Sequence, residues 1–69
     1  MIRRKTKHMV RVHLVQNEPS VEGVYMGRVG KHYRVEAARV IEAEDRSYEV
    51  TGSVLIPVER VAFIQVLPA

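Results

Sequence analysis

The stretch "GSVLIPVERVAFIQVL", residues 52–67, holds two apolar runs separated by one proline and three further residues. Proline cannot donate to a sheet ladder and fixes its own φ, so a strand that contains residues 54–56 must end at Pro57. Residues 58–60 leave room for a single 3₁₀ turn. The stretch therefore predicts a strand, one 3₁₀ turn and a last strand over residues 61–67.

This last strand has apolar side chains on both of its faces. Alternation puts Ala62, Ile64 and Val66 on one face, and it puts Phe63 and Leu67 on the other. One face can meet a core, whereas the other needs a different cover, and for so short a chain the obvious cover is a neighbouring subunit. We expect an oligomer or partner interface made by apolar residues of the last two strands: Ala62, Ile64, Val66, Tyr48 and Val50.

Two earlier strands follow from alternating apolar and polar residues. Val10–Leu14 alternates, and the polar loop after it contains asparagine and proline, which end a strand. Residues 21–29 are apolar but interrupted by Gly23 and Gly27. Because glycine inside a strand marks a bulge, a bend or a close backbone approach, this strand is predicted to bend at two points.

A tight turn at residues 30–32 leads into a third strand, from Tyr33 to Ile41, and a fourth runs from Tyr48 to Ile56. Residues 36–44 are also good helix formers, so a short helix is the alternative there. The fold class expected is all-β: a five-stranded, strongly bent antiparallel small barrel with a 3₁₀ turn before its last strand. Residues 1–8 form a basic, flexible arm, and residues 9–69 form a single small domain.

Positive charge gathers at the start of the chain. Five of the eleven Lys and Arg residues lie within residues 1–13, where there is no acid, and the remaining six accompany all eight Asp and Glu residues. This asymmetry indicates contact with phosphate or with an acidic neighbour. The candidate contacts are the cations of this region together with residues 31–34, which add a histidine and a tyrosine: Arg3, Arg4, Lys5, Lys7, Arg11, Lys31, His32, Tyr33 and Arg34.

The residues that usually perform catalysis or bind metals do not form a pattern in this chain. It has no cysteine, and its three histidines lack the spacing of a helical metal pair. The serines are not in a nucleophile elbow and the glycines do not form a phosphate loop. We therefore expect no enzyme, no metal and no cofactor. No apolar run is long enough to span a membrane, and the expected location is the cytoplasm or a virion.

The alternating first strand, the glycines of the second and the proline corner resemble the Sm-like proteins, and more broadly the SH3-like small barrels. Sm-like proteins show a V-x-V-x-L first strand, a glycine-containing bent second strand and a G-x-x-V-x-I-P-x-x-x-I-x-x-I-like corner. The matching positions are Val10, Val12, Leu14, Gly23, Gly27, Gly52, Ile56, Pro57, Val61 and Ile64. The resemblance covers residues 10–67 and implies the small-barrel fold and an oligomer.

The chain departs from the RNA-binding members of that family. Those proteins place Asp and Asn in the loop after the second strand, where this chain has Val29-Gly30-Lys31-His32-Tyr33-Arg34. The Arg-Gly pair near the fourth strand is replaced by Thr51-Gly52. A uridine pocket of the Sm type is therefore not expected, and any contact with nucleic acid would use the cations and Tyr33 in another way.

The whole chain also looks like the small SH3-like or Sm-like proteins that tailed bacteriophages encode among their virion genes. This resemblance implies a capsid-associated or connector-associated part. Two functions are expected from it and from the residues. The first is a non-enzymatic, homo-oligomeric assembly module, in a larger particle such as a phage virion. The alternative is an oligomeric Sm-like RNA- or DNA-binding protein that uses the basic arm and the Lys31–Arg34 loop.

Overall fold

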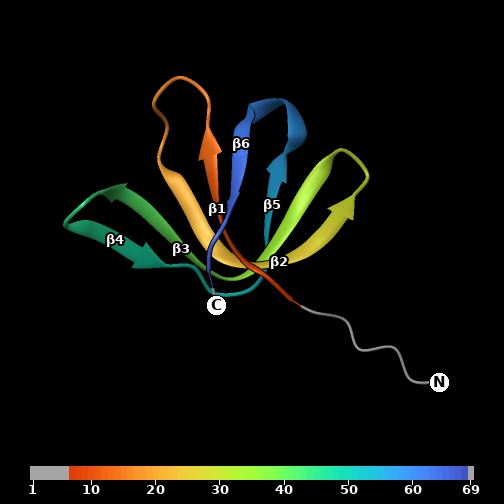
Figure 1. Cartoon of the computed structure of the whole chain (residues 1–69), viewed down its shortest axis with the longest axis horizontal. Coiled ribbons are helices and arrows are strands. Elements are labelled where there is room, and N and C mark those ends of the chain that lie inside the picture. Colours follow the sequence, from red (N-terminus) through yellow and green to blue (C-terminus); the bar gives the residue numbers. More distant parts are fainter. Residues whose placement is uncertain (1–6, 69) are drawn as a thin grey trace.

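The computed structural model describes residues 7–68. Figure 1 shows them as a strongly bent sheet whose strands are joined by short loops. The elements, in chain order, are β1 (Met9–Leu14), β2 (Ser20–Val29), β3 (His32–Ala43), β4 (Arg46–Glu49), β5 (Val54–Pro57), the 3₁₀ turn η1 (Val58–Arg60) and β6 (Val61–Val66). The neighbouring strands are antiparallel, in the order β4-β3-β2-β1-β6, and β5 pairs with the first part of β3.

The structure confirms an all-β antiparallel fold and the strand, 3₁₀ turn and strand at residues 54–66. The alternative of a short helix at residues 36–44 is wrong, because β3 runs unbroken as far as Ala43. The tendency of these residues to form a helix is overridden by pairing with strands on both sides.

The single fourth strand that the sequence predicts is two strands in the structure. β4 pairs with the last part of β3 and β5 with its first part, so both lie along the same edge of β3. Residues 50–53 separate them and contain Gly52 at φ +86°, a left-handed conformation that breaks the extended chain. The structure thus has six strands among the described residues where five were expected.

The sheet does not close on itself. Among residues 7–68, β5 pairs only with β3 and β6 only with β1. The chain leaves β5 at Pro57 and turns through η1, and β6 then pairs with β1 and not with β5. The order of the sheet therefore begins with β4 and ends with β6.

One face of the sheet, here called the inner face, holds the core. Its buried apolar residues come from four strands: Val10, Val12, Val21, Val35, Ala38 and Ile56. Partly buried residues pack around them, among them Tyr25, Val61 and Ile64. No polar or charged residue is buried among residues 7–68. The opposite side of the sheet, the outer face, carries the polar residues that alternate with these valines.

The neighbouring strand β3 leaves no room for a side chain at Gly23. A Cβ atom added to it would lie 2.6 Å from Val35 Cγ1 and 2.7 Å from the carbonyl oxygen of Glu36. The pairing of β2 with β3 shifts register at this point, where Ala37 has φ +51°. A second shift occurs beside Gly27, at φ +107°. The two glycines thus lie at the two irregularities of β2, in agreement with the predicted bends.

Candidate interaction surface

A row of polar side chains crosses the outer face. It follows the register from β6 through β1, β2 and β3 to β4. Its members, in that order, are Gln65, Arg11, Glu22, Arg39 and Glu49. Arginine and glutamate therefore alternate on four neighbouring strands, and opposite charges directly across a strand pair attract each other.

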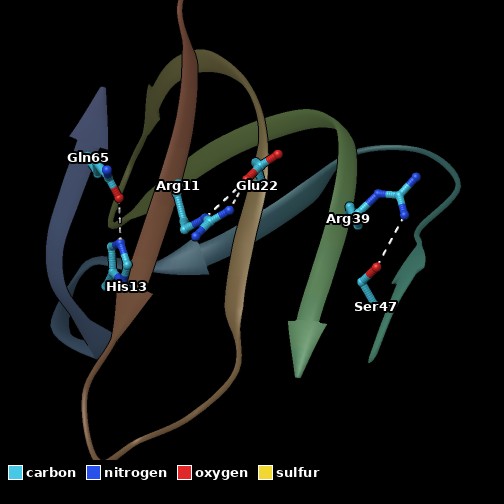
Figure 2. A network of polar contacts seen from close by, with 6 residues as sticks. All are labelled: Arg11, His13, Glu22, Arg39, Ser47 and Gln65. Carbon is cyan, nitrogen blue, oxygen red and sulfur yellow. Dashed lines mark hydrogen bonds and ion pairs between the residues drawn. The ribbon is translucent and has the colours of Figure 1, made fainter. Parts of the chain in front are cut away.

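Hydrogen bonds join members of this row in pairs, and Figure 2 shows the pair of Arg11 and Glu22. Arg11 donates through Nε and Nη2 to Glu22 Oε2, at 3.0 and 2.6 Å. Arg39 donates to Ser47 Oγ and to Glu49 Oε2, each at 3.2 Å. Both arginines of the row are therefore engaged by the sheet itself, and the row has little positive charge left for a ligand.

A stacked pair of rings lies next to the row. The rings of His13 and Phe63 have centroids 4.3 Å apart and are inclined by 17°. His13 Nε2 is also 3.0 Å from Gln65 Oε1, at hydrogen-bond distance. Phe63 remains 58% exposed in spite of this contact. The β6 end of the outer face thus has an apolar, aromatic character.

A groove of about 790 Å³ runs over this part of the outer face, and we call it the outer groove. Ala62 and Phe63 line it at β6, and Glu42 and Glu44 line it at the end of β3. Its walls also include Arg11, His13, Glu18, Glu22, Arg39 and Ser47. Among the described residues Glu18 pairs with Arg60, whereas Glu42 and Glu44 belong to no ion pair. The groove therefore has an exposed aromatic ring at one end and two carboxylates outside the ion pairs of the described residues at the other.

The residues expected at an interface lie at the two ends of the sheet. Tyr48 is on β4 and 51% exposed, and Val50 follows that strand, half-buried. On β6, Val66 is 60% exposed and Ala62 lines the outer groove. Ile64 differs from them, because it packs against the core opposite Val12. The five residues do not form one patch.

In the described part of the chain, the edge of β6 that faces away from β1 has unpaired backbone groups. The Leu67 amide donates to the Met9 carbonyl at 2.8 Å. In an antiparallel pair, alternate residues turn their N–H groups toward the same neighbour, so the amides of Ile64 and Val66 point away from β1. β4, at the other end of the sheet, pairs with β3 alone.

Those predicted cationic residues that the structure describes are not gathered at one place. Arg3, Arg4 and Lys5 lie outside the described residues, and Lys7 is exposed. Arg11 is paired with Glu22. Arg34 donates to Glu36 Oε2 at 2.7 Å and to Ser53 Oγ at 3.3 Å.

The side chains of residues 31–33, where the chain enters β3, do not all lie in the same surroundings. Tyr33 pairs in register with the buried Ile56 and lies 6.1 Å, centroid to centroid, from the ring of Tyr25. Lys31 and His32 instead line a second groove, of about 510 Å³, with Arg28, Pro57, Val58 and Glu59. Tyr33 thus lies beside Tyr25, which packs against the core. Arg28 is a cation of the second groove that sequence reasoning did not single out.

Sequence reasoning also missed Glu22, Arg39 and Glu49 as members of the outer row. Their signal was present, since each occupies a polar position in an alternating segment. Which polar positions face one another depends on register, however, and register was not predicted.

Among residues 7–68 no group of three or more acidic or histidine side chains is placed to hold a metal ion. The same part of the chain has no helix of the length and apolar character needed to cross a membrane. Comparison with protein-family models, with curated proteins and with solved structures finds no match for this chain.

Proposed function

We propose that this chain is a non-enzymatic assembly module that forms homo-oligomers through the two end strands of its sheet. The observation that carries this proposal is the pair of unpaired strand edges in the described residues, at β4 and at β6, each with an exposed apolar side chain beside it. Such edges are templates for pairing with another chain. Tyr48 and Val66 are the exposed apolar residues in question.

The two edges lie at opposite ends of the strand order, so they favour a head-to-tail contact. When the β4 edge of one copy pairs with the β6 edge of the next, the same contact can repeat around a ring. The small size of the core also favours association, because a chain of 69 residues is in the range where oligomers commonly add stability.

We also propose a type of small barrel and a location for this chain. We infer an open small barrel of the Sm-like or SH3-like type, supported by the strongly bent sheet and by the η1 corner between β5 and β6. The resemblance of the sequence to small virion proteins of tailed bacteriophages suggests a capsid-associated or connector-associated role, in a virion or in the cytoplasm where virions assemble.

Replacing Val66 tests the proposal without disturbing the core. Val66→Asp puts a charge on an exposed position, and Val66→Pro removes an amide that points away from β1. We expect both variants to keep the circular dichroism spectrum of the wild type but to elute as monomers in size exclusion with light scattering. Ile64→Asp is unsuitable because Ile64 packs against the core.

Two results would contradict the proposal. One is a wild-type chain that stays monomeric at every concentration measured. The other is a folded Val66→Pro variant that keeps the mass of the wild-type assembly, because an edge that tolerates proline is not extending a sheet.

A nucleic-acid interface remains the second candidate because one groove has a basic wall. Arg28, Lys31 and His32 lie around the second groove, with Glu59 as the acidic residue in its lining. If this groove binds phosphates, low-salt binding to short RNA or DNA should weaken steeply as salt rises, and Arg28→Gln with Lys31→Gln should reduce the slope. A protein peak without excess absorbance at 260 nm and no binding at low salt would exclude it.

A further inference from the structure

The outer groove has the shape and charge to accept an extended, cationic segment. One end of it is formed by Ala62 and the exposed Phe63, and the other by Glu42 and Glu44. The arginines between these ends are held by glutamates of the same sheet. A ligand that matches this order would have an apolar tip followed by cations.

The first seven residues of this chain have that order. They read Met-Ile-Arg-Arg-Lys-Thr-Lys, an apolar pair followed by four cations with no acid. Fully extended, seven residues span about 23 Å. The groove crosses from β6 to β4, which is four strand spacings, or roughly 19 Å. Length, charge and the position of the apolar residues therefore agree.

The direction of β1 indicates that the segment comes from another copy. The chain is still part of the sheet at His8, whose carbonyl accepts a hydrogen bond from the Tyr25 amide at 2.9 Å. Lys7 precedes His13, at the groove, by six residues, about 20 Å of extended chain. The described chain thus enters β1 at the end remote from the groove, and this favours a groove on another copy over the groove of the same sheet.

We propose that residues 1–7 of one copy bind in the outer groove of a second copy. Met1 and Ile2 pack at Ala62 and Phe63, where a guanidinium group can also stack on the exposed ring. The cations that follow approach Glu42 and Glu44. This inference rests on the proposed assembly function and gives its basic arm a binding site distinct from the strand edges.

A peptide-binding experiment on the full chain tests this site separately from the strand edges. The receptor is the full-length chain with Arg3, Arg4, Lys5 and Lys7 each replaced by Gln, so that its own first residues do not compete. The probe is a fluorescent peptide of residues 1–8, and its anisotropy is measured at low salt. We expect saturable binding of one peptide per chain.

Matched variants of the receptor locate the binding. Glu42→Gln with Glu44→Gln should weaken it about tenfold, because two attractive charge pairs between the groove and the peptide are lost. Asp45→Gln with Glu59→Gln removes the same charge from residues that do not line the groove, and should change the affinity less than twofold. Equal losses in the two double variants, or no saturable binding, would overturn the proposal.

The wild-type chain distinguishes the two possible donors of the segment. Diluted until light scattering gives a monomer, it should accept the labelled peptide, because no second copy is present to fill its groove. If the dilute monomer refuses the peptide while the receptor variant binds it, the segment occupies its own groove and the assignment to a second copy is wrong. An assembly that is lost in Val66→Pro, together with absent peptide binding, would remove this inference and leave the proposed function standing.

Discussion

The inner and outer faces of this sheet are built from the same strands but are held together by different forces. On the inner face, buried residues such as Val12 and Val35 contact one another across strands. On the outer face, Arg11, Glu22 and Arg39 alternate in charge across three of those strands. Burial of apolar surface stabilises the first arrangement, and paired but solvated charges contribute much less to the second.

The outer face contributes mainly to register. A slip of β2 against β1 by two residues would move Glu22 away from Arg11, although it would keep the apolar residues of both strands on the inner face. The valines alone therefore do not distinguish these two registers. The alternating charges do, because only the observed register places opposite charges directly across from each other.

The largest effect that would separate the two faces is expected at Gly23. In Gly23→Ala the new methyl group would meet Val35 Cγ1 and the Glu36 carbonyl, and the backbone oxygen cannot move aside as a side chain can. We expect a loss of about 3 kcal/mol or more, enough to unfold much of so small a domain at room temperature. Thermal unfolding followed by circular dichroism measures it.

Gly30→Ala is the control for that variant. Gly30 has φ +59°, but a Cβ atom there would meet nothing within 4 Å. Gly30→Ala should therefore lower the free energy of unfolding by about 1 kcal/mol, because alanine is strained in the left-handed conformation and meets no other obstacle. Equal losses in the two variants would mean that the close approach of β2 and β3 does not limit the residue at position 23.

Truncation of a core valine should have the next largest effect. Val12 has 0% exposure, so Val12→Ala removes buried methyl groups and leaves a cavity, at a cost of about 2–3 kcal/mol in urea unfolding. Val66→Ala makes the same chemical change at an exposed position of the same face and should cost less than about 0.5 kcal/mol in the monomer. A similar cost for both would contradict the placement of the core.

Loss of the Arg11–Glu22 ion pair should have the third largest effect on the free energy of unfolding. Glu22 is the better shielded partner, with a side chain 25% exposed, and it accepts two hydrogen bonds from Arg11. Glu22→Gln is expected to cost about 1 kcal/mol. A double-mutant cycle with Arg11→Met should give a coupling energy of similar size. A coupling of zero would show that the two side chains do not stabilise this register.

The smallest effect is expected at the end of the same row. The Glu49 side chain is 80% exposed, so Glu49→Gln should change the free energy of unfolding by no more than about 0.5 kcal/mol. Added salt should remove most of that difference. If Glu49→Gln lowers the free energy of unfolding as much as Glu22→Gln does, the exposure of a charge pair on the outer face does not determine how much it stabilises the fold.

Local patterns in the sequence were sufficient for some of these features. Pro57 and the three residues after it predicted the 3₁₀ turn, and the alternation of Val10–Leu14 predicted β1 with its correct inner residues. The two glycines of β2 predicted its irregularities. Each of these depends on the residues of one short segment and on their own conformational limits.

Features that depend on contacts between distant segments were not predicted. Ala37 adopts φ +51° although it is not glycine, and this shift sets which residues of β3 face inward. The division of the fourth strand depends on β4 and β5 sharing one edge of β3. Ile64, which the sequence pattern predicts at an interface, packs partly buried against the core opposite Val12, and this position depends on the pairing of β6 with β1.

The pairing of β1 with β6 has a consequence for folding. It joins Val10 to Val66, so the first strand of the sheet meets one of its two neighbours only after most of the chain has been synthesised. Contacts between such distant residues slow folding, because a long loop must close before they form. Until then one edge of β1 has no partner strand and lies beside the valines of the nascent core. We therefore expect a chaperone to protect β1 in the unfinished chain.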